Sequence, residues 1–148
     1  MITFLRTSEY YNTHAGKYFN KTININMTEF INRFCIYLPD KAHILDIGCG
    51  SGRDSKIFLM KGYTVTAIDG SKEMCKLASE YIGQEVLCKE FTEIDYINAF
   101  DGIWACASLL HLPPDELKEV FSKLSTSLKK NGYLYTCFKY GDREEWRD

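Results

Sequence analysis

Hydrophobic and polar positions along the chain fall into two patterns that alternate over most of its length. Some segments are short, mostly apolar and rich in β-branched or aromatic residues, which predicts buried strands. Other segments place apolar residues three or four positions apart, which predicts amphipathic helices. Strands are expected at residues 43–47, 63–69, 85–91, 101–109 and 133–140.

The predicted helices lie before and between these strands and carry recognisable end signals. Thr28 and Ser71 are candidate N-caps, because a hydroxyl oxygen can accept a hydrogen bond from a free backbone N–H group of the first turn. The two prolines at 113–114 suit a helix entry, and the Asn-Gly pair at 131–132 suits a helix end. Helices are expected at residues 8–37, 53–62, from 72 onward, and 113–130.

Strands that alternate with helices predict βαβ units and therefore a parallel sheet. The fold class is α/β: a doubly wound, mostly parallel sheet of Rossmann-like type, with five strands and helices on both faces. A chain of 148 residues suits one domain. Within it, residues 1–40 form an N-terminal helical segment, and residues 41–148 form the α/β core.

Composition narrows the function classes without naming one. A formal net charge of -2 offers no large basic field, so we expect neither nucleic acid nor a membrane as a partner. No segment resembles a membrane span or a signal peptide. None of the 6 cysteines forms a C-x-x-C pair, which favours free thiols in the cytoplasm and no metal site.

The most informative stretch is the loop GCGSG, which follows the first predicted strand. Ligands of open α/β sheets bind outside the carboxyl ends of the strands, and glycines let a ligand approach the backbone closely. The spacing G-x-G-x-G differs from the dinucleotide fingerprint G-x-G-x-x-G. Asp46, two residues before the first glycine, would repel a pyrophosphate and suits a cationic ligand. A nicotinamide-dependent oxidoreductase is therefore disfavoured.

A second acid, Asp69, ends the second predicted strand about twenty residues further on. A carboxylate there can accept hydrogen bonds from both hydroxyls of a ribose. The pattern thus predicts a ligand with a ribose and a positive group. S-adenosylmethionine (SAM), which carries an amino group and a sulfonium, fits both requirements.

Four stretches in order along the chain resemble the motifs of class I SAM-dependent methyltransferases: ILDIGCGSGRDS, VTAIDGS, FDGIWACASLLHL and LKKNGYLYTCFKYG. The resemblance covers residues 8–141 and is closest to small-molecule enzymes similar to tellurite-resistance methyltransferases. It implies transfer of a methyl group from SAM to a small-molecule nucleophile. The usual C-terminal strands of that family are not recognisable in this chain.

The resemblance also implies a role for each matching position. Asp46 is expected near the amino group of the methionine part, Asp69 at the ribose, and Arg53 at the ligand carboxylate. For Arg53 an ion pair, and for Glu90 a solvated strand-end acid, are the alternatives. The implied cofactor-binding residues are Asp46, Gly48, Cys49, Gly50, Arg53, Asp69, Gly70, Met74, Glu90, Phe91, Ala105 and Cys106.

Aromatic residues and histidines supply the candidates for the acceptor side. The segment YYNTHAGKYFN at 10–20 is similar to the lid that closes over the cofactor in related methyltransferases, and its Tyr11 and His14 are candidate catalytic residues. A helix that packs its aromatic side chains on the domain is the alternative. His111, just past the fourth predicted strand, either takes a proton from the acceptor or only orients its surroundings.

The fifth predicted strand would be an open sheet edge, and its apolar sequence is poorly suited to exposure. We therefore expect a homodimer or a complementing chain at residues 133–139. The alternative to an enzyme is a truncated SAM-binding module that needs a partner chain for activity.

Overall fold

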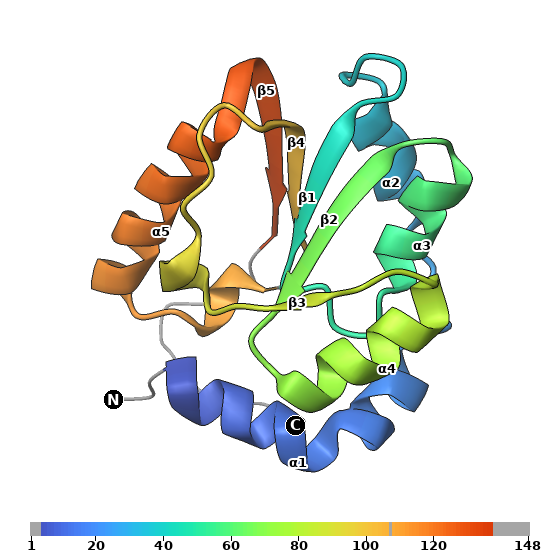
Figure 1. The fold of residues 1–148 in the computed structure, drawn as a ribbon, viewed down its shortest axis with the longest axis vertical. Helices are drawn as coiled ribbons and strands as arrows, with labels where there is room; N and C mark the ends of the chain where they lie inside the picture. Colours follow the sequence, from blue (N-terminus) through green and yellow to red (C-terminus); the bar gives the residue numbers. More distant parts are fainter. Residues whose placement is uncertain (1–3, 107, 138–148) are drawn as a thin grey trace.

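A computed structural model describes residues 4–106 and 108–137. Its centre is one five-stranded sheet with the order β3-β2-β1-β4-β5 (Figure 1). Every neighbouring pair is parallel, which confirms the predicted fold class. The strands are β1 (His43–Ile47), β2 (Thr64–Asp69), β3 (Leu87–Cys88), β4 (Phe100–Ala105) and β5 (Leu128–Thr136).

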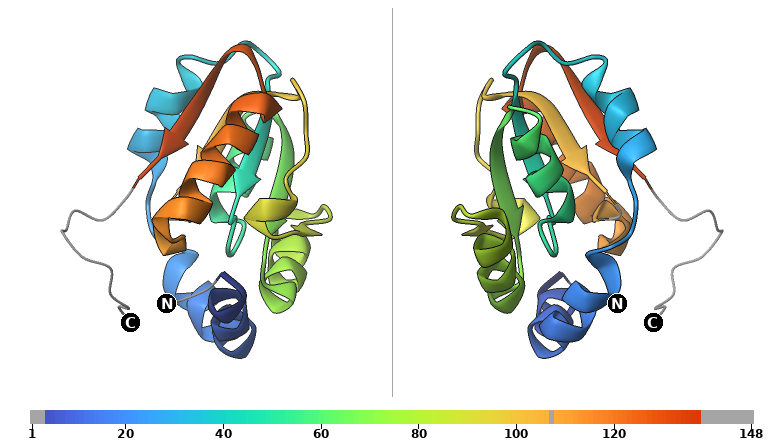
Figure 2. Two further views of the ribbon diagram at one scale, coloured as in Figure 1. Left: turned by 90° about the vertical axis from the view of Figure 1, so that its left-hand side faces the viewer. Right: turned by 90° about the vertical axis from the view of Figure 1, so that its right-hand side faces the viewer.

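Helices cover both faces of the sheet, and one helix lies across its end. In Figure 1, α5 covers one face while α2 and α3 cover the other. Figure 2 shows α1 crossing below the carboxyl ends of the strands, beside α4. The helices are α1 (Phe4–Thr22), α2 (Thr28–Cys35), α3 (Arg53–Met60), α4 (Lys72–Ile82) and α5 (Pro114–Ser127), with short 3-10 helices η1 (Phe91–Glu93) and η2 (Leu109–His111).

The core has two halves because successive side chains of a strand point to opposite faces of the sheet. Ile44 and Trp104 face α2 and α3, where they pack with Phe34 and Phe58. Leu45 and Ile103 face the other side, in the cluster that also holds Leu124 of α5. Both faces of the central strands are buried, which explains why their sequences are almost continuously apolar.

Several predicted boundaries are wrong. The helix expected at 8–37 is two helices, α1 and α2, with residues 23–27 between them. The strand expected at 101–109 ends at Ala105, and the Asn-Gly pair at 131–132 lies within β5 instead of ending a helix.

Two further boundaries differ because of hydrogen bonding with neighbouring segments. The strand expected at 85–91 is paired only at β3, since Glu90 and Glu93 form a reciprocal capping box that starts η1. The helix expected at 113–130 ends with Ser127, and β5 begins at Leu128 beside Phe100. Pairing with β4 thus overrides the helix propensity of the following lysines.

The two predicted N-caps have different outcomes. Ser71 caps α4 as expected, because its Oγ accepts a hydrogen bond from the N–H of Met74. Thr28 does not cap α2. It is the first residue of that helix, and its own N–H donates to Oδ1 of Asn26 at 2.9 Å. Among the described residues, no helix is long and apolar enough to cross a membrane.

Gly52 is the third glycine of the loop after β1 and lies against α4. Its replacement tests how tightly the loop and this helix are packed. It has φ of +81°, and a Cβ built on it would lie 2.7 Å from Cγ2 of Ile82 on α4. We expect Gly52→Ala to lower the free energy of unfolding by about 3 kcal/mol, the sum of a left-handed backbone and overpacking. Urea denaturation measures this loss.

Gly62→Ala is the matched control. Gly62 also has a left-handed backbone, with φ of +93°, but no atom lies within 4 Å of its added Cβ. Only the backbone cost of about 1–2 kcal/mol should appear. Equal losses for the two variants would show that contact with α4 is not what requires glycine at position 52.

Candidate functional site

The glycine loop sits at the carboxyl end of β1, where the sequence predicts it. Gly48, Gly50 and Gly52 all have left-handed φ values, of +64°, +56° and +81°. Such backbone angles are strained for residues with a Cβ, so the three glycines allow the sharp turn from β1 into α3. The N–H of Cys49 donates to the carbonyl of Ile68, which holds the loop against β2.

Asp69, the last residue of β2, connects this loop to the next one. One oxygen of its carboxylate accepts a hydrogen bond from the N–H of Gly50, and the other accepts from the N–H of Ser71, both at 2.9 Å. The residue is buried, and burial raises the pKa of its carboxyl group to about 6, although the two N–H donors oppose that shift. Asp69 therefore lies where the sequence predicts a ribose-binding acid.

Asp46 is buried on β1 and faces α3. Its Oδ2 accepts a 2.6 Å hydrogen bond from the hydroxyl of Ser55. Burial raises the pKa of this carboxyl group well above its usual value, and the nearby charge of Asp54 acts in the same direction. A cationic ligand near Asp46 would favour its ionised form.

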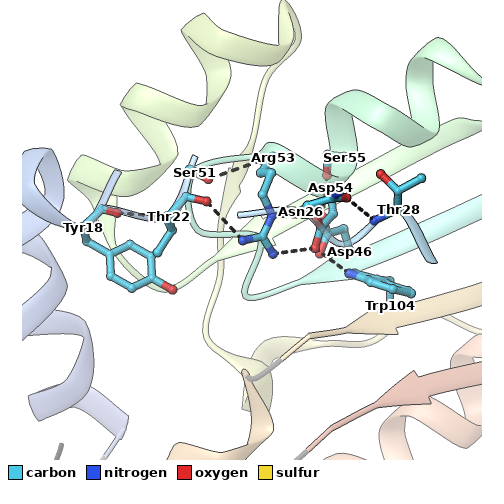
Figure 3. Close-up of polar contacts among 10 residues, drawn as sticks. All are labelled: Tyr18, Thr22, Asn26, Thr28, Asp46, Ser51, Arg53, Asp54, Ser55 and Trp104. Atoms are coloured by element: carbon cyan, nitrogen blue, oxygen red, sulfur yellow. Dashed lines mark hydrogen bonds and ion pairs between the residues drawn. The ribbon is translucent and has the colours of Figure 1, made fainter. Parts of the chain in front are cut away.

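Arg53 and Asp54 form a buried ion pair at the start of α3 (Figure 3). Nε and NH2 of Arg53 donate to the two carboxylate oxygens of Asp54, at 2.8 and 3.1 Å. Asp54 also accepts a hydrogen bond from the indole N–H of Trp104 on β4. NH1 of Arg53 donates to the carbonyl of Thr22, the last residue of α1. Arg53 thus holds the end of α1. It could bind a ligand only in addition to its hydrogen bonds with Asp54 and Thr22.

Helix α1 lies over the glycine loop and presents aromatic rings to it. The ring of Tyr18 lies 3.3 Å from the position of a Cβ on Gly50. Tyr11 packs edge-on against Tyr18 with ring centroids 5.0 Å apart. Burial raises the pKa of both phenols, and the carboxylate of Asp69 adds to the rise. His14 instead stacks on Tyr10, and its Nδ1 lies 2.9 Å from the carbonyl of Tyr10.

Asn12 is a contact residue that the sequence does not reveal. Its Oδ1 accepts hydrogen bonds from the hydroxyl of Ser71 at 2.7 Å and from the N–H of Glu73 at 3.2 Å. It therefore fastens α1 to the first turn of α4. The partners lie about sixty positions away in the sequence, so no local pattern could have indicated them. Asp54 was missed for a related reason, because its partner Trp104 comes from a distant strand.

The remaining predicted residues surround the same edge of the sheet. Met74 is buried at the start of α4, Gly70 follows β2, and Phe91 is buried at the start of η1. Glu90 caps η1 with its side chain, and Ala105 ends β4. A cavity lies between the end of α1, the glycine loop, the start of α3 and the end of β4. It is lined by Tyr18, Thr22, Asp46, Gly48, Cys49, Gly50, Ser51, Arg53, Asp54 and Cys106. The other predicted cofactor residues do not line it: Asp69, Gly70, Met74, Glu90, Phe91 and Ala105.

His111 is only partly described. Its backbone belongs to η2, while its side chain lies outside the described part of the structure. Its predicted role in proton transfer stays a prediction. Within residues 4–106 and 108–137, no group of three or more His, Cys, Asp or Glu side chains could hold a metal ion.

Comparison with known proteins gives a consistent family. Residues 44–132 match the family described as methyltransferase domain. An uncharacterised methyltransferase of Staphylococcus carnosus (strain TM300) is 28% identical over 127 residues, covering 86% of this chain and 60% of that protein. The 18S rRNA (guanine-N(7))-methyltransferase bud23 of Schizosaccharomyces pombe is 30% identical over 139 residues, covering 83% of this chain and 52% of that protein.

A solved structure gives the same result. The crystal structure of Burkholderia thailandensis 1,6-didemethyltoxoflavin-N1-methyltransferase contains 1,6-didemethyltoxoflavin and S-adenosylhomocysteine. It matches with a TM-score of 0.70 and 26% sequence identity, covering 88% of this chain and 60% of that chain. The chain spans about half the length of the curated relatives it matches.

One prediction about partners is wrong. The low net charge had excluded nucleic acid, and the family resemblance had implied a small-molecule acceptor, but the relative bud23 is an rRNA methyltransferase. Net charge sums over the whole surface, whereas RNA contacts depend on where individual charges lie, so the sum excludes nothing. A homodimer or complementing chain was expected at residues 133–139, a segment that only in part belongs to β5. Residues 138–139 lie outside the described residues, and β5 is the last strand of the sheet.

The Arg53–Asp54 pair gives a test of the buried charges in this site. Arg53→Met leaves the Asp54 carboxylate buried without its cation, so we expect the free energy of unfolding to fall by about 3 kcal/mol or more. Arg33→Met is the matched control. Arg33 pairs with Glu29 at the same 2.8 Å, but their side chains are 70% and 69% exposed, compared with 16% and 7% here.

For Arg33→Met we expect a change of about 0.5 kcal/mol or less, since exposed ion pairs contribute little. Chemical denaturation of both variants measures the difference. A loss of similar size in the two variants would mean that the Arg53–Asp54 pair is not the stabilising contact that its burial indicates.

Proposed function

The chain belongs to the methyltransferase domain family, and on that premise we propose that it transfers a methyl group from SAM to a nucleophilic atom of an acceptor. SAM as the cofactor agrees with the family and with the bound S-adenosylhomocysteine of the Burkholderia relative. The observation that carries the proposal is the carboxylate of Asp69, which hydrogen-bonds both the glycine loop and the turn after β2.

The charges around the cavity support a cationic ligand. Asp46 and Asp54 are buried and line the cavity, and Arg53 is the cation that pairs with Asp54. Asp69 is buried beside the cavity, where it accepts a hydrogen bond from the N–H of the lining residue Gly50. Two carboxyl groups, those of Asp46 and Asp69, are thus without a cationic partner among the described residues, and burial raises both their pKa values. A ligand that brings a sulfonium and an amino group would offset part of this cost.

We assign the residues as follows. The backbone of Gly48 and Gly50 lies against the methionine part, Asp46 faces its amino group, and Asp69 accepts from the ribose hydroxyls. Met74, Gly70, Glu90 and Phe91 enclose the adenine, and Cys49, Ala105 and Cys106 lie along the ligand. Bound SAM supplies an electrophilic methyl group, which the acceptor atom takes as the carbon–sulfur bond breaks. The chain's own contribution is to position the two reactants and to exclude water.

Residues 1–40 are proposed as a lid on a core of residues 41–148. Two contacts hold α1 in place. Asn12 of α1 hydrogen-bonds Ser71 at the start of α4, and Arg53 hydrogen-bonds the carbonyl of Thr22 at the end of α1. Tyr18 lines the cavity and Tyr11 packs edge-on against it, so the ring of Tyr18 would meet the cofactor with Tyr11 behind it. His14 packs on Tyr10, and a catalytic role for it stays a prediction.

The acceptor class is to be decided by experiment, because the relatives act on different acceptors. Transfer of radiolabel from methyl-labelled SAM should be assayed with small-molecule nucleophiles and with ribosomal RNA in parallel. Labelled product with either one supports the enzyme and names the class. SAM binding without transfer to any acceptor would favour a SAM-binding module that needs a partner chain. A small-molecule acceptor of the kind that the resemblance to tellurite-resistance methyltransferases implies stays a prediction. The assays with small-molecule nucleophiles would test it.

Replacement of Asp69 tests the cofactor pose. We expect Asp69→Ala to weaken S-adenosylhomocysteine binding at least about 100-fold, since it removes the acceptor of two ribose hydroxyls and frees the Gly50 and Ser71 N–H groups. Isothermal titration calorimetry measures the affinity. Asp101→Ala is the control, because Asp101 also accepts a backbone hydrogen bond, from His43, but lies at the amino ends of β1 and β4, away from the site. Unchanged affinity in the Asp69 variant would exclude this pose.

The raised pKa of Asp69 predicts how binding depends on pH. In the free chain this carboxyl group is protonated below about pH 6, and it must lose that proton before both oxygens can accept from a ribose. Affinity for SAM should therefore fall as the pH drops from 7 to 5, by up to about tenfold per unit below 6. Asp46 acts in the same direction. Calorimetry in buffers of different ionisation enthalpy should show proton release at pH 5.5; constant affinity from pH 5 to 8 would contradict the assignment.

A further inference from the structure

Ser108 carries a buried hydroxyl group that the site described above does not use. The residue is 7% exposed, and its Oγ has no hydrogen-bond partner within residues 4–106 and 108–137. Ser108 is the N-cap residue of η2, yet its side chain makes no capping hydrogen bond. Serine is preferred at this position because its oxygen can accept from free N–H groups of the first turn. Here the Ser108 hydroxyl accepts no hydrogen bond from those N–H groups.

The position of this hydroxyl relates it to the glycine loop. A Cβ built on Gly48 would lie 2.5 Å from Cβ of Ser108, 3.3 Å from its Oγ and 3.2 Å from the ring of Phe91. Ser108 therefore lies directly beside the first glycine of the loop, on the side where the ring of Phe91 also approaches it. Both neighbours, Gly48 and Phe91, are assigned above to the methionine and adenine parts of the cofactor.

An unpaired buried hydroxyl is unfavourable in the free chain and is expected to find a partner when one is supplied. Two other buried side-chain oxygens in the described residues lack partners, and they belong to Glu116 on α5 and Thr136 at the end of β5. Of these three oxygens, Oγ of Ser108 lies close to Gly48 in the glycine loop. The polar atoms that would reach this place are those of a ligand lying on that loop.

We propose that the hydroxyl of Ser108 is a cofactor-binding group that hydrogen-bonds a polar atom common to SAM and S-adenosylhomocysteine. This inference rests on the proposed function. It adds a side-chain hydrogen bond from the segment after β4, where Ala105 and Cys106 are already placed along the ligand, to the contacts from the ends of β1 and β2. The cofactor would thus be held by three neighbouring strand ends, and the contact would be present before and after the methyl group leaves.

The test compares the binding of S-adenosylhomocysteine with the thermal stability of the free chain. Ser108→Ala removes one oxygen and keeps the Cβ that touches Gly48. We expect its affinity to fall roughly tenfold, the equivalent of one hydrogen bond. Because the hydroxyl is unpaired in the free chain, the melting temperature without ligand should stay the same or rise.

Ser127→Ala is the matched control. Ser127 is fully buried, and its hydroxyl donates to the carbonyls of Tyr96 and Lys123. This variant should melt at a lower temperature and bind S-adenosylhomocysteine as tightly as the original chain. The two serines thus predict opposite combinations of stability and affinity.

Three outcomes decide the matter. Weaker binding with an undiminished melting temperature supports the role of Ser108. Unchanged affinity overturns it, and so does a clearly lowered melting temperature, which would show that the hydroxyl already has a partner in the free chain. If the original chain itself fails to bind S-adenosylhomocysteine, the proposed function fails first, and the serine variants are then compared by melting temperature alone.

Discussion

The site depends on one carboxylate that holds two loops together. Asp69 ends β2, and its oxygens accept hydrogen bonds from Gly50 in the loop after β1 and from Ser71 in the turn after β2. Parallel pairing brings these two strand ends side by side, and the shared acceptor fixes the distance between the loops. Every other group proposed to touch the cofactor is positioned relative to this pair of loops. The same burial that allows the bridge raises the pKa of the carboxyl group.

Buried carboxylates lower the stability of a protein that has no ligand bound. Their presence is therefore evidence for a ligand that offsets this cost. Asp46 and Asp54 line the cavity, Asp69 is buried beside it, and the charge of Asp54 is compensated by Arg53. Replacing a whole buried ion pair by apolar residues is often neutral or stabilising for a fold. Their presence beside a glycine loop is consistent with a site that favours a positively charged ligand. Arg53 extends the arrangement, since it also binds the carbonyl at the end of α1.

Much of the fold and part of the site could be predicted because their signals are local. The strand 43–47, the glycine loop and the acid at the end of 64–69 are each contained in a few consecutive residues. The strand starting at Leu128 could not be predicted, because pairing with Phe100 decides it. Likewise Asn12, Trp104 and Ser108 acquire their roles from residues far away in sequence. The net charge led to the wrong exclusion of a nucleic acid acceptor, because it does not say where on the surface the charges lie.

The hydrogen bond from Trp104 to Asp54 has an optical consequence. The indole is fully buried, its N–H donates to the carboxylate that pairs with Arg53, and its ring stacks on Tyr135 at 4.0 Å. Arg53 in turn contacts the end of α1. A movement of α1 that disturbed Arg53 would alter the electric field at an intrinsic fluorophore. The fold thereby contains its own spectroscopic reporter of whether the N-terminal helix is seated, without any added label.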